Sequence, residues 1–445
     1  MSESSLPLVG CRMTVPGTGA AAWHAARMLR WLGARVECRA ENTGAAADWA
    51  MSGAMALTGR RAGPPLLPPG QAASAARGAL LATELVVGAA GRLPGVRLLG
   101  ERAAAAGLLR AAPRSAAGAF HLVRAADGWL GVNLARPSDV DLIPAWLGEA
   151  GSAWQAAVAR RPAGELAARA RLLGLPVAAP PDGPDEQLVA RGQTEQVRPL
   201  VVTGRSRPGG GGPAGALVVD LSSLWAGPLC GHLLTLLGAR VVKVESTHRP
   251  DGARQGPRAF YDLLHAGQES VTVDFASPLG RRRLAGLVAA ADVVIEASRP
   301  RALRQAGVDA DEVLGRAEHK VWMSITAYGR TGPWSNAVGF GDDTAVAAGL
   351  LTTDPVTGTP APCGDAIADP VTGVNAALAA VACLAAGGTW LVDLAMREQV
   401  AATLTEISGP GDVSSVADPV ARRPAGVAPA FGVDTERVLA ELGLT

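Results

Sequence analysis

Six short apolar segments recur through the C-terminal half of the chain, and stretches with helical character separate them. They read ALVVDL, RVVKVE, SVTVDF, DVVIEA, VWMSIT and TWLVDLAM, and all lie within residues 215–400. Strands that are apolar throughout and alternate with helices are typical of parallel sheets covered by helices on both faces. The pattern predicts an α/β fold in which residues 215–400 form a large domain around an open, doubly wound parallel sheet.

A long run of small apolar residues, AIADPVTGVNAALAAVACL, lies in this domain at residues 366–384. Pro370 suits the first position of a helix, where its missing N–H costs nothing, so we expect Asp369 at the N-cap or just outside it. For an isolated Asp-Pro pair, helix capping is the commoner role. Taken alone, the run therefore predicts a helix with a capping carboxylate and no chemistry.

Residues 1–110 repeat part of the same pattern. The segment LGARV occurs at residues 32–36 and again at residues 237–241, an offset of 205. Further along, WAMSGAMALTG resembles AVAAGLLTTD at an offset of 296. Self-similarity of this kind indicates an internal repeat. We expect residues 1–110 to be a degenerate copy of the large domain.

This N-terminal copy is expected to be incomplete. With Gly53 set on Gly349, Ala73 falls opposite Asp369, so the copy has no carboxylate at that position. The two offsets differ by 91 residues, which is the length of the expected deletion. Nothing in residues 40–50 resembles VTVDF or ADVVIE. The copy should therefore lack the middle strands of the sheet.

Residues 111–190 have a different pattern, which predicts a small α+β domain. FHLVRAADGWLGVNL contains two strand-like alternations joined by Asp127-Gly128, a strong hairpin signal. Residues 191–214 contain TGRSRPGGGGPAG without a following GK[ST], so we expect a flexible Gly/Pro linker that binds no ligand. Residues 401–445 are expected to form a proline-rich C-terminal tail with a terminal helix.

Composition excludes some classes of partner. The chain has 445 residues, 48% of them hydrophobic and 18% charged, which is enough for two or three domains with real cores. A net charge of +1 gives no global field for nucleic acid or an anionic membrane, and the longest apolar run falls short of the ~20 residues of a span. Five cysteines without CxxC spacing, and an N-terminus unlike a signal peptide, predict reduced thiols, no metal site and a cytoplasmic protein.

Six blocks between residues 218 and 396 carry a resemblance to a known family. They read VVDLSSLWAGPLCGHLLTLLGARVVKVE, SVTVDFASPLGRRRL, ADVVIEASRP, VWMSITAYGRTGP, GFGDDTAVAAGLL and IADPVTG. In this order they resemble the large domain of the class III CoA-transferases, the CaiB/BaiF-type family of formyl-CoA and carnitine-CoA transferases. The resemblance implies a Rossmann-like large domain. It also implies that Asp369 is the aspartate nucleophile, which is compatible with a capping role.

An aspartate suits the transfer of CoA from a thioester to a carboxylate. The carboxylate of Asp369 would attack an acyl-CoA to give a mixed anhydride, which the released thiolate converts to an aspartyl-CoA thioester. With a usual pKa near ~3.9, Asp is ionised at neutral pH without a general base. The tetrahedral stages need fixed donors, for which the N–H groups of Thr372, Gly373 and Val374 are candidates. Acyl-CoA is the expected substrate, and no covalently bound cofactor is expected.

Nucleotides bind at strand-to-helix turns of open α/β sheets, and AGP follows the first strand of this domain. On sequence alone, a plain helix start is an equal alternative for AGP. The resemblance adds the turns STHRPDGAR and EASRP, where arginines can pair phosphates, although a single Arg is more often a solvated surface residue. The candidate CoA contacts are Trp225, Ala226, Gly227, Pro228, Arg249, Arg254, Ala297, Ser298, Arg299 and Arg301.

The chain departs from family members at several of these places. Trp225 stands where formyl-CoA transferase has a glutamine, which indicates a more apolar acyl pocket unless Trp225 is simply a core residue. Ala297 stands where many members have asparagine. The racemase branch has a histidine where this chain has Phe340, so racemisation is discounted. The loop RSAAGAF, residues 114–120, is shorter than the glycine-rich lid of the family.

These features predict a class III CoA-transferase that acts on an acyl-CoA and a small carboxylate. If the short loop admits water or another acceptor, the same aspartate gives a thioester hydrolase or an acyl transferase to a non-carboxylate nucleophile. A third alternative, a non-catalytic acyl-CoA-binding protein, is disfavoured by the presence of Asp369.

The order of the parts also predicts an assembly. In ordinary members, which run from large domain to small domain to tail, two chains interlock as a dimer. Here a degenerate large domain and a small domain precede the working large domain. We therefore expect a pseudo-dimer within one chain, with the two large domains about a pseudo-twofold axis. Whether the chain also forms a homo-oligomer stays open.

Overall fold

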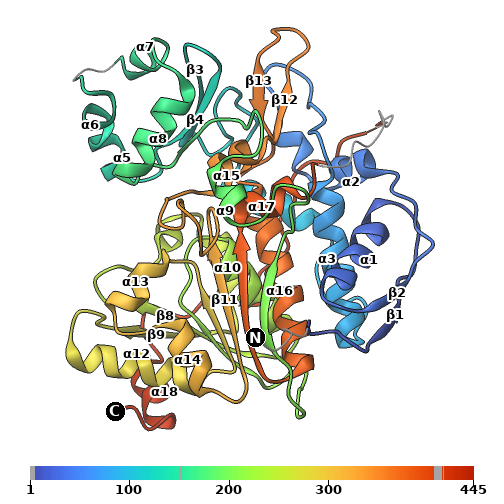
Figure 1. Ribbon diagram of the computed structural model, residues 1–445, viewed down its shortest axis with the longest axis vertical. Coiled ribbons are helices and arrows are strands. Elements are labelled where there is room, and N and C mark those ends of the chain that lie inside the picture. The colour runs from blue at the N-terminus through green and yellow to red at the C-terminus, as the bar shows by residue number, and fades with distance from the viewer. Residues whose placement is uncertain (1–5, 150–152, 405–412, 414) are drawn as a thin grey trace.

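The computed structural model describes residues 6–149, 153–404, 413 and 415–445. Its centre is a seven-stranded sheet in the order β9-β8-β7-β10-β11-β14-β6 (Figure 1). Neighbouring strands are parallel except β14 and β6. Without β6, the order is that of doubly wound nucleotide-binding sheets, which confirms the predicted parallel α/β sheet. The strands are β6 (Val201–Arg205), β7 (Leu217–Asp220), β8 (Arg240–Ser246), β9 (Glu269–Val273), β10 (Val293–Glu296), β11 (Lys320–Thr326) and β14 (Thr389–Ala395).

Successive strand residues enter two cores, one on each face of the sheet. Val218 and Val293 belong to the core that also contains α10 (Ala226–Leu236) and α16 (Ala368–Ala386). Val219 and Val294, the next residues along the same strands, belong to the opposite core. The helices of that core are α12 (Pro278–Ala290), α13 (Pro300–Gln305), α14 (Ala310–Arg316) and α18 (Thr435–Glu441).

The segment expected to be a bare linker, residues 191–214, is built into this sheet. Strand β6 pairs antiparallel with β14 at its edge. Beyond β6, Gly210 packs so closely against the carbonyl oxygen of Ala385 that a Cβ would clash, and the N–H of Gly211 donates to the carbonyl of Leu384 (3.0 Å). The glycine run therefore allows a close backbone contact with the end of α16, which corrects the prediction of a flexible tether.

The small domain has its own core and sheet. Strands β3 (Phe120–Arg124) and β4 (Trp129–Asn133) form the hairpin that the sequence predicts, and β5 (Val177–Ala178) pairs with β4. Trp146 and Leu166 lie fully buried on this sheet. The domain projects from the sheet domain at the upper left of Figure 1. Its helices are α5 (Pro137–Asp141), α6 (Ile143–Leu147), α7 (Trp154–Val158) and α8 (Ala163–Leu173).

The N-terminal unit contains a short strand–helix–strand element followed by helices. Strands β1 (Arg12–Thr14) and β2 (Arg35–Glu37) are parallel, flank α1 (Ala20–Trp31), and pair Met13 with Val36. The offset of 205 carries this pair onto Val218 and Val241, which pair in β7 and β8. Three further helices complete the unit. They are α2 (Ala45–Met51), α3 (Ala72–Val87) and α4 (Glu101–Ala106).

Helix α16 packs between the large domain and the N-terminal unit. It contacts α10 of its own domain and α3 of the N-terminal unit (Figure 1). The offset of 296 carries Ala72, the first residue of α3, onto Ala368, the first residue of α16. In the described ranges α16 is the one helix long and apolar enough to cross a membrane, but 83% of that stretch is buried inside the protein, as in a core helix.

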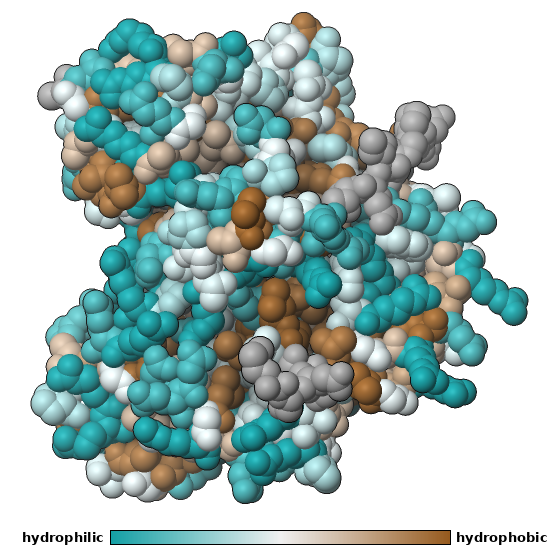
Figure 2. Space-filling model, viewed as in Figure 1, coloured by the Kyte–Doolittle hydropathy of each residue, from teal (hydrophilic) through white to brown (hydrophobic). Residues whose placement is uncertain are grey.

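The remaining elements surround the carboxyl end of the sheet and its edges. On the face shown in Figure 2, hydrophilic side chains predominate and apolar ones lie in scattered groups. The elements are α9 (Glu186–Ala190), α11 (Arg258–His265), α15 (Gly341–Ala348), β12 (Leu351–Thr353), β13 (Pro360–Pro362) and α17 (Met396–Ala401), with short 3-10 turns at Met55–Leu57, Val96–Gly100 and Gly252–Gln255.

A methyl group added between α10 and α16 should destabilise the fold. At Gly373 a Cβ would lie 2.7 Å from the carbonyl oxygen of Ala226 and 3.0 Å from the side chain of Leu229. Gly373→Ala should therefore force the helices apart and lower the free energy of unfolding by about 1–3 kcal/mol in urea titrations. As a control, Gly315→Ala in α14, where a Cβ meets nothing within 4 Å, should leave stability unchanged or raise it. Equal stability of the two variants would contradict the close packing of α10 on α16.

Candidate active site

The start of α16 presents one carboxylate to solvent. The helix begins at Ala368 with Ile367 as its N-cap, so Asp369 is its second residue and Pro370 its third. The predicted position of Asp369 at the N-cap is therefore wrong; a proline is tolerated here because the first helical N–H groups have no intrahelical partner. From Ala368 to Cys383 every residue is buried except Asp369, which is partly exposed.

Backbone strain flanks this carboxylate. Among the described residues, the two non-glycine residues with positive φ are Ala366 (45°) and Leu224 (71°). The N–H of Ala366 donates to Oδ1 of Asp342 (2.8 Å), and its carbonyl accepts from the N–H of Asp369 (2.9 Å). Leu224 lies two residues before Ala226, whose N–H faces the Asp369 carboxylate and lowers its pKa. Such strain persists only where the surroundings enforce it, and it concentrates at functional sites.

A buried ionic network holds the strained turn between β7 and α10. The N–H of Leu224 donates to Oδ1 of Asp251 (3.0 Å). The ammonium of Lys243 lies 3.1 Å from Asp251 and 3.6 Å from Asp220, and it also donates to the carbonyl of Ser222. These contacts give a structural reason for the aspartate of VVDLS and the lysine of VVKVE. Together they fix the N–H of Ala226 in front of Asp369.

Three carboxylates and one guanidinium share the site. Arg102 binds Asp365 through two hydrogen bonds, one of them from Nε at 2.8 Å. The guanidinium of Arg102 also lies 5.3 Å from the centre of the Trp225 ring. The carboxylates of Asp342 and Asp369 lie near this pair and influence its charge. Among the described residues, Arg102 is therefore the cation that acts on Asp369.

The dry surroundings make these acids weak. Burial raises the pKa of Asp369 to about 7; the Arg102 cation opposes this shift, and the Asp342 and Asp365 carboxylates reinforce it. Burial likewise raises the pKa of Asp342 to about 6. Burial also raises the pKa of Asp343, which follows Asp342 in α15, to about 8. Asp369 is thus only partly ionised at neutral pH, in contrast to the full ionisation that an ordinary Asp would have.

Sequence reasoning missed four residues of this site: Asp342, Asp365, Arg102 and Ser115. Arg102 belongs to α4 of the N-terminal unit, and no motif surrounds it. Ser115 lies buried in the 114–120 loop, and its hydroxyl lies near enough to Asp342 to lower the pKa of that carboxyl. The short loop therefore contacts the carboxylate cluster directly. Over the ranges that the structure describes, no group of three or more His, Cys, Asp or Glu side chains is arranged to hold a metal ion.

The predicted oxyanion donors lie elsewhere. Thr372, Gly373 and Val374 are inside α16, where helical N–H groups bond to carbonyls four residues earlier. Their N–H groups are not free for a substrate, so this prediction is wrong. Gly373 serves instead to let α10 approach. The N–H that does face the carboxylate is that of Ala226.

The turn after β7 contains four of the predicted CoA contacts. Ala226, Gly227 and Pro228 form the buried first turn of α10, preceded by the buried Trp225. Trp225 lies against Arg102 and faces the carboxylate cluster. Ala297 is exposed just after β10, which is the neighbour of β7 in the sheet. The carboxyl ends of these two strands form the switch point where ligands of doubly wound sheets bind.

The predicted arginines divide into two kinds. Arg254 pairs with Glu245 (2.5 Å) and donates to the hydroxyl of Ser270 (3.2 Å), so it is not free for a phosphate. This corrects the prediction for Arg254, whose guanidinium stabilises the turn after β8.

Arg249, Arg299 and Arg301 gather without an acidic partner among the described residues. Burial lowers the pKa of Arg299, and the neighbouring cations Arg301, Arg136 and Arg249 lower it further. Arg136 comes from the small domain, was not predicted, and is paired with Asp139 (2.6 Å). The hydroxyl of Ser298 is buried and has no hydrogen-bond partner within the described part of the chain. Mutually repelling guanidinium groups beside an unpaired hydroxyl suit a bound polyanion such as a nucleotide phosphate.

Residues 214–423 match the sequence model of CoA-transferase family III. The succinyl-CoA–D-citramalate CoA-transferase of Chloroflexus aurantiacus is 29% identical over 42% of this chain and 50% of that protein. The succinate–glutarate CoA-transferase of Agrobacterium fabrum is 31% identical over 38% of this chain and 46% of that protein. A solved CAIB/BAIF family protein from Brucella suis is 30% identical, covering 45% of this chain and 56% of that chain, with a TM-score of 0.40. The chain spans about half the length of the curated relatives that it matches.

The raised pKa of Asp369 should make the free energy of unfolding depend on pH. Because the folded state holds the proton up to pH about 7, against the usual 3.8, ionisation destabilises the fold progressively between these values. The gain in unfolding free energy from Asp369→Asn should be near zero at pH 4, grow up to pH about 7 and then level off. The exposed Asp141→Asn variant is the control and should show no such trend. Parallel pH profiles of wild type and Asp369→Asn in urea titrations would refute the raised pKa.

Proposed function

Because residues 214–423 match the sequence model of CoA-transferase family III, we propose that this chain moves CoA between an acyl-CoA thioester and a carboxylate, with Asp369 as the nucleophile. The observation that carries the proposal is that Asp369 alone is partly exposed between Ala368 and Cys383 of α16, at a strained turn beside the sheet's switch point. Members of this family use CoA thioesters as substrates without a separate cofactor.

The first half-reaction forms an activated aspartate. The ionised Asp369 carboxylate attacks the thioester carbonyl, the C–S bond breaks, and a mixed anhydride and a CoA thiolate result. The thiolate then attacks the aspartyl carbonyl of the anhydride, which releases the donor as a free carboxylate and leaves an aspartyl-CoA thioester. The acceptor carboxylate repeats these steps in reverse order, so charge and atoms balance and no proton carrier is needed.

Two groups beside Asp369 can stabilise the charge that develops. The N–H of Ala226 faces the Asp369 carboxylate and lowers its pKa, so it can donate to the oxyanion when the thiolate attacks the aspartyl carbonyl. The Arg102 cation faces the same carboxylate and favours its ionised, nucleophilic form. Trp225 covers this cation with an aromatic face and offers an apolar wall to the acyl group.

The CoA phosphates are assigned to the arginine cluster. Arg249, Arg299 and Arg301 follow the second and fourth strands of the sheet, and Arg136 approaches them from the small domain. Arginine pairs phosphate oxygens in a two-pronged fashion, and a polyanion would relieve the repulsion among these cations. Ser298 adds a buried hydroxyl donor.

The second candidate function is transfer of the acyl group to water or another non-carboxylate nucleophile. The short 114–120 loop favours it, because this loop is held at the carboxylates by Ser115 in place of a longer lid. Release of CoA from acyl-CoA without an added carboxylate would identify a hydrolase. A requirement for the carboxylate would identify the transferase.

The N-terminal unit is proposed to be a degenerate large domain, packed on the working one as a pseudo-dimer. The matching register of β1–β2 and β7–β8, and the matching starts of α3 and α16, support this. Ion pairs connect the halves: Arg102 with Asp365, and Arg422 with Glu101 (3.0 Å). The N-terminal unit thus supplies a cation to a site whose nucleophile lies in the other half.

Replacing the nucleophile should abolish turnover without unfolding the protein. We expect Asp369→Asn to lower kcat at least about a thousandfold, because the amide cannot form the anhydride. Asp141→Asn should keep full activity. Hydroxylamine added with acyl-CoA should convert residue 369 of the wild type to a hydroxamate detectable by peptide mass. Retained turnover in folded Asp369→Asn would refute the role of Asp369.

A single cut between the halves should leave an active complex. Residues Glu195 and Gln196 are exposed and lie before β6, so a protease site inserted there spares the sheet. We expect the nicked chains to co-elute in size-exclusion chromatography and to keep activity, because helix packing and ion pairs hold them together. The fragment 196–445 alone lacks Arg102 and the small domain, and should be inactive. An active, monodisperse 196–445 fragment would contradict the proposed complementation.

A further inference from the structure

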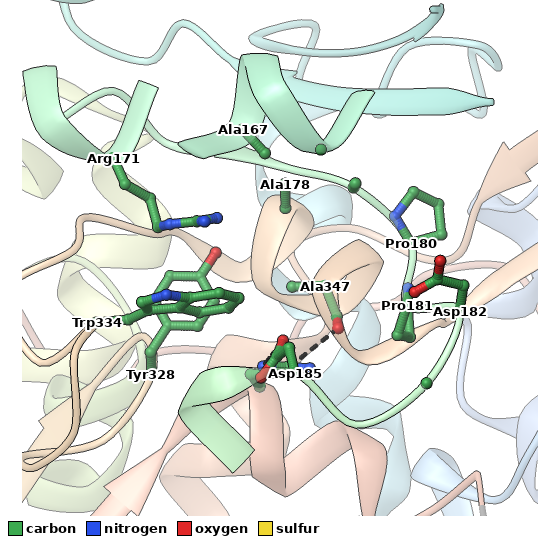
Figure 3. Close-up of a pocket in the computed structure, with 14 residues that line it drawn as sticks. Ala167, Arg171, Ala178, Pro180, Pro181, Asp182, Asp185, Tyr328, Trp334 and Ala347 are labelled. Atoms are coloured by element: carbon green, nitrogen blue, oxygen red, sulfur yellow. Dashed lines mark hydrogen bonds and ion pairs between the residues drawn. The ribbon is translucent and has the colours of Figure 1, made fainter. Parts of the chain in front are cut away.

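A cavity lies between the small domain and the large domain. It has a volume of about 210 Å³. One wall comes from α8 and the segment that follows β5, and the other from the loop after β11 and from α15 and α17 (Figure 3). Ala178, Pro181 and Ala347 give it an apolar lining. An apolar cavity of roughly 150 Å³ holds a benzene molecule, so this one has room for a ring that carries a polar group.

An aromatic pair with two cations forms one end of this cavity. The guanidinium of Arg171 lies 3.9 Å from the centre of the Trp334 ring, and that of Arg397 lies 5.4 Å from it. Tyr328 meets Trp334 edge-on at 5.5 Å. The indole N–H of Trp334 donates to Glu186 (2.6 Å), which fixes the ring. In Figure 3 the hydroxyl of Tyr328 points toward Arg171.

Two side chains in the cavity have no hydrogen-bond or ion-pair partner in the described part of the chain. Arg397 is not one of them, since its Nε donates to the carbonyl of Ala347 (3.0 Å) and its Nη1 forms an ion pair with Asp185 (2.7 Å), although Nη1 itself makes no hydrogen bond. By contrast, the side chains of Arg171 and Tyr328 make no hydrogen bond or ion pair with any residue that the structure describes. Tyr328 is only 4% exposed. A buried hydroxyl and a half-buried guanidinium left unpaired side by side call for an acceptor from outside the chain.

We propose that this cavity binds the carboxylate of a small organic acid, with Arg171 and Tyr328 as the donors. Arg–carboxylate contacts are strong because both partners are charged. Burial raises the pKa of the Tyr328 phenol, which therefore stays a neutral donor. The acidic side chains nearby, Asp185 and Glu186, disfavour a doubly charged anion such as phosphate. The hydrocarbon part of the acid packs on the apolar lining.

This site is separate from the Asp369 carboxylate. Helix α15 begins at Gly341, whose Cα lies against the Asp369 carboxylate, and Ala347 is six residues further along. Six residues of α-helix span about 9 Å. An acid bound at Arg171 is therefore held away from the nucleophile, and it bridges the small domain to the large domain. Because the small domain also provides Ser115 and Arg136, occupancy would fix both relative to Asp369.

The test is a calorimetric titration of the full chain with benzoate, and with benzamide as the uncharged probe of the same shape. We expect saturable benzoate binding and at least about tenfold weaker benzamide binding, since benzamide cannot form the charged contact. Arg171→Gln should weaken benzoate binding at least about tenfold. Arg169→Gln, on the exposed side of the same helix, is the matched control and should bind as the wild type does. Asp369→Asn should also bind normally, which distinguishes this site from the reaction site.

Tyr328→Phe guards against a folding artefact. The hydroxyl has no hydrogen-bond partner among the described residues, so this variant should keep the melting temperature of the wild type while it binds benzoate several-fold more weakly. The proposal is overturned if benzoate does not bind, if benzamide binds equally well, or if Arg171→Gln or Tyr328→Phe binds as the wild type does. Loss of binding in Asp369→Asn would overturn it as well, because it would place benzoate at the reaction site.

Discussion

Asp369 has to reach solvent from the stretch of α16, Ala368 to Cys383, that is otherwise buried, and the surrounding structure depends on how this is achieved. Helix α16 can cross the core because its side chains are small, and Gly373 lets α10 approach it closely. The backbone strain is concentrated near the start of the helix, where Ala366 and Leu224, both with positive φ, lie in the turns on either side of the carboxylate. Its partial desolvation weakens the acid, while one N–H and one cation support the ionised form.

The cation comes from the N-terminal unit, outside the domain that contains Asp369. Arg102 binds Asp365, four residues before Asp369, and so couples the N-terminal unit to the strained turn. The buried α3–α16 contact and the Arg422–Glu101 pair hold the two halves in this relation. In physical terms, the site is a joint product of both halves, although its local motifs belong to one of them.

Local patterns were sufficient for the sheet and for the nucleophile candidate. Strands that are apolar throughout predicted the parallel sheet, and the resemblance of IADPVTG and the five preceding blocks to the class III CoA-transferases implied the role of Asp369. Features that depend on tertiary packing could not be read in this way. No motif surrounds Arg102, because its role depends on which helix end meets Asp365. From the sequence, Gly373 was predicted as a backbone donor, because nothing local shows that α10 packs against it. The pKa of Asp369 depends on its burial, which the sequence does not show.

The most direct test of Asp369 as the nucleophile follows one oxygen atom. When the acceptor carboxylate carries oxygen-18, its attack on the aspartyl-CoA thioester puts a labelled oxygen in the anhydride bridge, and thiolate attack on the acceptor side leaves that oxygen on Asp369. After turnover, peptide mass spectrometry should find the label on Asp369 and on no other carboxylate of the protein. Turnover that leaves Asp369 unlabelled would mean that the acceptor reacts without a covalent aspartyl intermediate, and Asp369 would then not be the nucleophile.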